Sequence, residues 1–146
     1  MLPYSKNVIA ICDGDVTAAE TSTGVIDTLG ADFMTLDVIM GTADAVSNNP
    51  STLTLYQGAA GTALTDGTAI TSLTGDGVGG FTIPNAVTSG KYVVRFNLDL
   101  EPYKRYVYVA VTPLYASPLV VSASLFRNGE MPISATKANV TGLVEG

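Results

Sequence analysis

The chain has 146 residues, the size of one domain, and its net charge of −6 at pH 7 argues against a general nucleic-acid binder, whose footprint is basic. Charged residues make up only 14% of the chain and apolar residues 47%, so part of the surface is expected to lie against other protein. Zero histidines and a single cysteine exclude Ser-His-Asp triads, Cys-His dyads and zinc sites built from these two residue types.

Residues 1–23 are predicted to form an N-terminal arm or the first strands. Their apolar run, Val8–Cys12, is too short for a signal-peptide core or a membrane span, so neither export nor membrane association is expected. Cys12 has no histidine to pair with and is predicted to be a small buried residue. Asp13 and Asp15 can offer oxygens to Ca²⁺, but an EF-hand loop needs a glutamate at its twelfth position, which is glycine here. A plain turn is therefore predicted at these two aspartates.

Alternation of apolar and polar residues predicts strand after strand through the middle of the chain. The period of two is clearest in residues 33–40, 52–56, 91–98, 105–112 and 119–125. Weaker candidates lie near residues 7–12, 15–19, 24–28, 68–73 and 80–83. We therefore predict an all-β fold in a single domain, residues 1–146: an antiparallel β-sandwich with extended terminal arms and with a jelly roll as the leading topology.

Two segments interrupt this alternation. Residues 57–90 are rich in glycine, threonine, aspartate and alanine, which predicts short strands joined by wide surface turns. Within them, Gly75–Gly80 superficially suggests a phosphate-binding loop, but no Gly-Lys-Ser/Thr follows, so no nucleotide or other cofactor is predicted. Residues 128–146 are predicted to be an extended C-terminal arm, which either lies along a neighbouring subunit or frays as a terminus.

The stretch LEPYKRYVYVAV, residues 100–111, places two cations and three tyrosines at the start of an apolar strand. The strands 91–98 and 105–112 are predicted to form a hairpin that bends at Glu101 and Pro102. In a local interpretation, the cations only pair across this bend with Asp99 and Glu101.

A second interpretation makes the same stretch an assembly contact. Arg105 would bind a carboxylate of a neighbouring subunit through its planar guanidinium, while the tyrosines add contact area. The carboxylate is expected among residues 1–90, which hold nine of the thirteen acidic residues. The candidate interface residues are Lys104, Arg105, Tyr106 and Tyr108. No catalytic, metal or cofactor-binding residues are predicted.

Loops rich in small residues and strands rich in valine make up about half of the chain. The loop 58–67 is built from alanine, glycine and threonine, the strands 105–112 and 119–125 are rich in valine, and residues 28–39 and 51–56 continue the pattern. In this style, and as a short chain free of histidine and tryptophan, the protein resembles the small proteins of tailed bacteriophages that decorate or cement the capsid.

The resemblance implies a structural virion protein that is not an enzyme, made in the host cytoplasm and located on the capsid surface. It implies two partners, the major capsid protein and further copies of the chain itself, with a trimer favoured because cement proteins occupy three-fold sites. It implies no cofactor and no nucleic-acid partner. The alternative is a receptor- or carbohydrate-binding β-sandwich of a tail fibre or adhesin, against which the absence of tryptophan counts.

Overall fold

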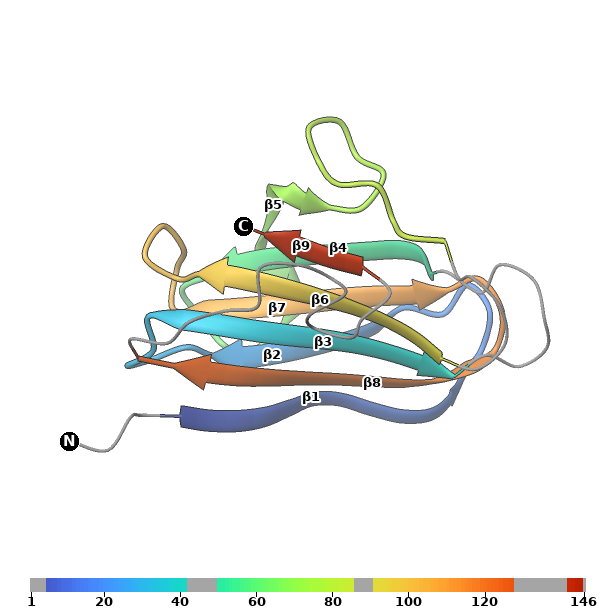
Figure 1. Cartoon of the computed structure of the whole chain (residues 1–146), viewed down its shortest axis with the longest axis horizontal. Helices are drawn as coiled ribbons and strands as arrows, with labels where there is room; N and C mark the ends of the chain where they lie inside the picture. The colour runs from blue at the N-terminus through green and yellow to red at the C-terminus, as the bar shows by residue number, and fades with distance from the viewer. Residues whose placement is uncertain (1–4, 42–49, 86–90, 128–141, 146) are drawn as a thin grey trace.

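The computed structural model describes residues 5–41, 50–85, 91–127 and 142–145, which form two β-sheets packed face to face (Figure 1). The five-stranded sheet contains, in spatial order, β1 (Ser5–Val16), β8 (Ser117–Phe126), β3 (Phe33–Gly41), β6 (Lys91–Asp99) and β9 (Gly142–Glu145). The four-stranded sheet contains, in spatial order, β2 (Ser22–Asp27), β7 (Tyr106–Pro113), β4 (Pro50–Gly58) and β5 (Thr68–Thr74).

Neighbouring strands in both sheets are antiparallel, except that β9 runs parallel to β6. A single 3₁₀ turn, η1 (Leu64–Asp66), interrupts the connection between β4 and β5. The predicted all-β antiparallel β-sandwich is therefore confirmed.

The core lies between the two sheets and is built by the alternation seen in the sequence. In β3, for example, Met34, Leu36, Val38 and Met40 are buried, and the residues between them point to the outer face. Five strands contribute most of the inward-facing residues: Met34, Leu36, Val38 and Met40; Leu53 and Leu55; Tyr92, Val94, Phe96 and Leu98; Val107, Val109 and Val111; Leu119, Val121, Ala123 and Leu125.

The predicted hairpin between residues 91–98 and 105–112 is wrong. These segments are β6 and β7, which follow each other in the chain but belong to opposite sheets. β6 pairs with β3 and β9, whereas β7 pairs with β2 and β4. Because both strands carry a fully apolar face, each can line the shared core from its own side, and the bend at Glu101 and Pro102 crosses from one sheet to the other.

Two weaker predictions also need correction, and one strand was missed. Residues 15–19 do not form a separate strand, because β1 runs on to Val16. Residues 80–83 contain only an isolated bridge, between Gly75 and Phe81. The strand β9 was not predicted, because it is four residues long and lies in the segment expected to be an arm.

The N-terminal predictions are also revised by β1. Asp13 and Asp15 lie inside this strand, where its pairing with β8 shifts register, and not in a plain turn. Cys12 is exposed and not buried. The reason is the alternation of the strand: Ile11 points into the core, so its neighbour Cys12 points outward, next to Val120 of β8.

The two terminal arms are described only in part. Within residues 1–23, β1 and the start of β2 belong to the sandwich. Of the expected C-terminal arm, residues 128–141 and 146 lie outside the described residues, and residues 142–145 form β9 on the edge of β6.

Candidate assembly interface

The candidate interface residues lie at the end of the sandwich where the chain passes from β6 into β7. Lys104 is exposed, and its backbone N–H donates a hydrogen bond of 3.0 Å to the side-chain oxygen of Gln57, at the end of β4. Arg105 is also exposed at 47% of its side-chain surface. Two cationic groups therefore stand at the surface on a short segment tied to the neighbouring strand.

Arg105 forms a bidentate ion pair with Asp27, the last residue of β2. Its Nε–H donates to Oδ1 of Asp27 at 2.9 Å, and its Nη2–H donates to Oδ2 at 2.7 Å. The guanidinium also lies over the ring of Tyr106, 4.9 Å from the ring centroid. This geometry uses the planar fork and the π-face preference of arginine together.

The local interpretation of Arg105 is corrected by this pair. Its carboxylate partner is neither Asp99 nor Glu101, because the bend leads away from β6 to the other sheet. Within the chain the partner is Asp27, which does come from residues 1–90, and the expected contact with a neighbouring subunit stays a prediction. The cause is the register of β2 with β7, in which Asp27 is directly opposite Tyr106 and so lies beside Arg105.

Thr28, which follows Asp27 in the chain, holds the same segment through two further hydrogen bonds. The carbonyl oxygen of Arg105 accepts two hydrogen bonds from Thr28, one from its backbone N–H at 3.0 Å and one from its hydroxyl at 2.6 Å. The cationic segment is thus fixed by Gln57, Asp27 and Thr28 before any partner binds. A contact surface that is already ordered loses less conformational entropy on binding.

The two tyrosines have different environments. Tyr106 is half-buried, with its ring against Gly61 in the connection between β4 and β5. Tyr108 is buried to 1% exposure, below Gly58 at the end of β4 and Gly67 of the β4–β5 connection, and its hydroxyl has no hydrogen-bond partner among the described residues. Tyr108 therefore cannot touch a partner as predicted; it supports Tyr106 and the covering loop.

The Arg105 side chain, which donates two hydrogen bonds to Asp27, lowers the pKa of this carboxyl group from 3.8 to about 2. A group whose pKa is lowered by folding stabilises the protein above its unfolded pKa, and this stabilisation is lost as the pH falls toward the folded pKa. Asp27→Asn should therefore lower the Tm at neutral pH by no more than about 4 °C, because the pair is exposed. Between pH 4 and pH 2 the difference from wild type should disappear. Thermal melts across this range check it, and a difference that persists at pH 2 would contradict it.

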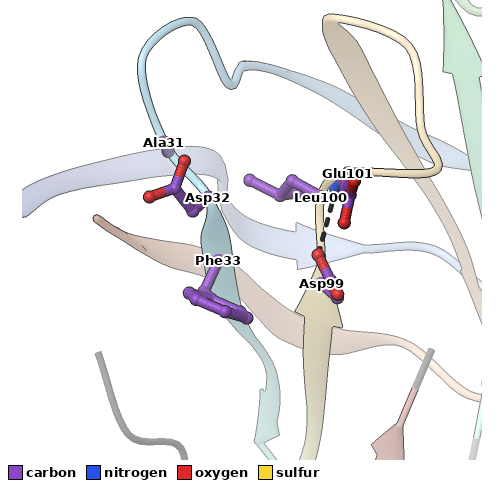
Figure 2. A pocket seen from close by; sticks show the side chains of 6 residues that line it. All are labelled: Ala31, Asp32, Phe33, Asp99, Leu100 and Glu101. Carbon is purple, nitrogen blue, oxygen red and sulfur yellow. Dashed lines mark hydrogen bonds between the residues drawn. The ribbon is translucent and has the colours of Figure 1, made fainter. Parts of the chain in front are cut away.

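Next to this segment, an acidic hollow of about 480 Å³ opens between the β2–β3 turn and the end of β6 (Figure 2). Figure 2 shows the side chain of Leu100 reaching toward Asp32, with Phe33 below and Asp99 and Glu101 on the opposite wall. Asp99 accepts the backbone N–H of Glu101 at 3.0 Å. Apolar walls with carboxylates at the rim suit the aliphatic stem and charged head of a lysine or arginine side chain.

A smaller acidic hollow of about 260 Å³ is lined by Asp13, Gly14, Val16, Glu20 and Ser22. Its carboxylates are bound within the chain: the Ser22 hydroxyl donates to Asp13 at 2.6 Å, and the Thr17 hydroxyl donates to Glu20 at 2.7 Å. Across the described ranges, no three histidine, cysteine, aspartate or glutamate side chains come together as metal ligands.

Asp27 and Gln57 are the site residues that sequence reasoning missed. Each is a polar residue at the end of a strand, a place where many residues have no partner, and only the strand pairing brings them to residues 104–105.

The chain matches no protein-family model and no curated protein. In the part of the chain that the structure describes, no helix is long and apolar enough to cross a membrane.

Proposed function

We propose that this protein is a structural protein of a tailed-phage virion that decorates or cements the capsid and stabilises the head through contacts with the major capsid protein. It acts by binding and not by catalysis. The proposal rests above all on the sequence resemblance, and the low content of charged residues supports it.

The strand order supports a further proposal, that the sandwich is a jelly roll. β1 pairs with β8, β2 with β7, β3 with β6 and β4 with β5. Such nested antiparallel pairs are what a long hairpin gives when it is rolled into two sheets. Jelly rolls occur in viral capsid domains and also in lectins, so the fold class alone does not decide between the two functions.

The cationic segment at Lys104 and Arg105 is the contact that we assign to the capsid. Near it, three acidic residues, Asp32, Asp99 and Glu101, line the hollow. A surface that presents the fixed guanidinium of Arg105 and the exposed side chain of Lys104 beside three carboxylates can recognise a partner surface of the opposite charge pattern. Individually weak contacts of this kind are multiplied when many copies bind a repeating lattice.

The proposal predicts the behaviour of phage heads that lack the protein. These heads should release DNA at a lower temperature than complete heads, and purified protein should restore the release temperature when it is added back. The measurement is DNA release on heating, followed with a dye that the intact shell excludes. Unchanged release in both experiments would contradict the proposal and favour a receptor-binding role.

Two variants separate a capsid contact from a purely internal ion pair in the same experiment. Arg105→Ala should require roughly 10-fold or more protein for the same restoration, because it removes an exposed anchor. Asp27→Asn keeps the arginine but removes its partner within the chain. If Arg105 only holds β2 to β7, both variants should behave alike; if Arg105 touches the capsid, Asp27→Asn should retain most of the binding.

A further inference from the structure

The connection between β4 and β5, residues 59–67, forms a strap over two of the candidate interface residues, Tyr106 and Tyr108. A Cβ at Gly61 would lie 2.7 Å from Cδ1 of Tyr106, and a Cβ at Gly67 would lie 3.2 Å from Cδ2 of Tyr108. Glycine, which has no side chain, lets the backbone approach the two rings this closely. At these two positions the strap therefore rests on the rings through its main chain.

The hydrogen bonds of the strap stay within it. The carboxylate of Asp66 accepts the hydroxyl of Thr62 and the backbone N–H of Ala63, the latter at 3.3 Å. The backbone N–H of Asp66 donates to the carbonyl oxygen of Ala63 at 3.0 Å, and that of Gly67 donates to the carbonyl oxygen of Leu64 at 2.9 Å. Among the described residues, no hydrogen bond joins the strap to either ring beneath it. The strap is thus a self-contained turn, attached to the sandwich by its two ends and by packing.

Tyr108 is buried beneath the strap with its polar group unsatisfied. Its exposure is 1%, and its hydroxyl has no hydrogen-bond partner within the described part of the chain. Tyr92, in the core, is buried as completely, but its hydroxyl donates to the carbonyl oxygen of Pro84 at 2.7 Å. A buried hydroxyl without a partner has lost its hydrogen bonds to water and has gained none in return. The closed strap therefore removes the hydration of the Tyr108 hydroxyl without replacing it.

Two opposing effects act on the strap. Packing of its main chain on the rings favours the closed arrangement, whereas hydration of the Tyr108 hydroxyl favours an open one. Because the hydrogen bonds of the strap do not involve the rings, the strap can swing away as a unit without losing them. Gly58 and Gly67 stand at its two ends, where small residues can absorb the change in backbone direction. A segment attached in this way opens at a lower free energy than the whole domain unfolds.

We propose that the strap opens and closes over Tyr106 and Tyr108, and so controls whether these two rings are accessible next to Arg105. The structure describes the closed arrangement, in which Tyr108 cannot be reached from outside. In the open arrangement both rings face solvent on the outer face of the four-stranded sheet, with that of Tyr106 under the guanidinium. The surface at the cationic segment is therefore variable in size. The opening itself does not depend on the proposed function, whereas its use in capsid binding does.

Hydroxyl-radical labelling of individual tyrosines, read by mass spectrometry at less than one modification per chain, tests the opening. Tyr115, which is 54% exposed, is the reference for a free ring, and Tyr92 is the reference for a ring buried in the core. We expect Tyr108 to be labelled at least about 10-fold faster than Tyr92, because local opening needs less free energy than global unfolding. A Tyr108 ring protected as strongly as that of Tyr92 would overturn the proposal.

Gly61→Ala should shift the strap toward the open arrangement. The added Cβ would overlap the ring of Tyr106, whose movement is limited by the guanidinium of Arg105 that lies over it. Labelling of Tyr108 should accelerate by at least about 10-fold, while that of the core reference stays unchanged. Gly14→Ala is the matched control, since a Cβ there has nothing within 4 Å, and it should change neither rate. Unchanged labelling of Tyr108 in Gly61→Ala, or equal acceleration of the core reference, contradicts the proposal.

Removal of the hydroxyl alone provides a second test. Tyr108→Phe should keep or raise the Tm and slow the labelling of Tyr106 by roughly 3-fold or more, because closing the strap no longer buries an unpaired group. Tyr92→Phe, which loses a hydrogen bond in the core, should lower the Tm. If Tyr108→Phe lowers the Tm as much as Tyr92→Phe, the hydroxyl is satisfied in the closed arrangement and the proposal is wrong. All these measurements use the purified protein, so the head-stability experiment judges the proposed function separately.

Discussion

Replacing Phe96 with alanine should lower the free energy of unfolding by about 3–5 kcal/mol. Phe96 is fully buried on the inward face of β6. Its ring also meets that of Phe81 edge to face, with centroids 5.4 Å apart and an angle of 83° between the planes. The change thus removes core packing and the anchor of the β5–β6 connection together. Urea unfolding measures the loss, and the Tm should fall by roughly 10 °C.

Phe126→Ala is the matched control, because Phe126 lies on the outer face at the end of β8 and is only half-buried. It removes the same atoms but leaves the core intact, so its effect should be clearly smaller. If the two variants were equally destabilised, the core between the sheets would not be where most of the stabilisation arises. A second variant, Phe81→Leu, should lose mainly the ring contact, worth about 0.5–1.5 kcal/mol.

Gly80→Ala is expected to have the next largest effect, a loss of roughly 1–3 kcal/mol from overpacking. A Cβ at this position would overlap the carbonyl oxygen of Thr74 and lie 2.9 Å from its carbonyl carbon and 3.2 Å from the carbonyl oxygen of Thr71. All three atoms belong to the backbone of β5, so no side-chain rotation can relieve the overlap. The loop has to change its path, and thermal unfolding should report the loss.

Gly14→Ala provides the comparison for this prediction. A Cβ at position 14 has nothing within 4 Å, so the substitution should leave the stability nearly unchanged. Equal behaviour of the two variants would mean that the β5–β6 connection does not hold its shape in solution. The exposed Val78 lies in the same connection, and its replacement should have little effect on folding, since it is 99% exposed.

The strands with a long alternating pattern could be predicted from the sequence. β3, β6, β7 and β8 each bury one face against the opposite sheet. The alternation of residue types along each of these strands therefore indicates which side chains point into the core. The strands that were missed or misjudged lie at the sheet edges. β1 changes register, so its alternation is broken, and β9 is too short to show a period.

The candidate site could be predicted only in part, because its residues are brought together by pairing between strands that lie far apart in the sequence. Arg105 and its expected type of partner were visible in the sequence, but Asp27 becomes its partner only through the register of β2 with β7. Likewise, Tyr108 has the composition of a contact residue, and only the path of the β4–β5 connection over it makes it a buried one. Contacts between residues far apart in the chain leave no local pattern.

The short strand β9 also bears on the solubility of the protein. Without it, β6 would be the last strand of its sheet, with the backbone groups of Val94–Asn97 unpaired beside an apolar strand. An open edge of this kind pairs readily with extended segments of other chains and can start fibre-like aggregation. By pairing in parallel with β6, residues 142–145 occupy this edge, so four residues near the C-terminus protect the apolar sheet from edge-to-edge association.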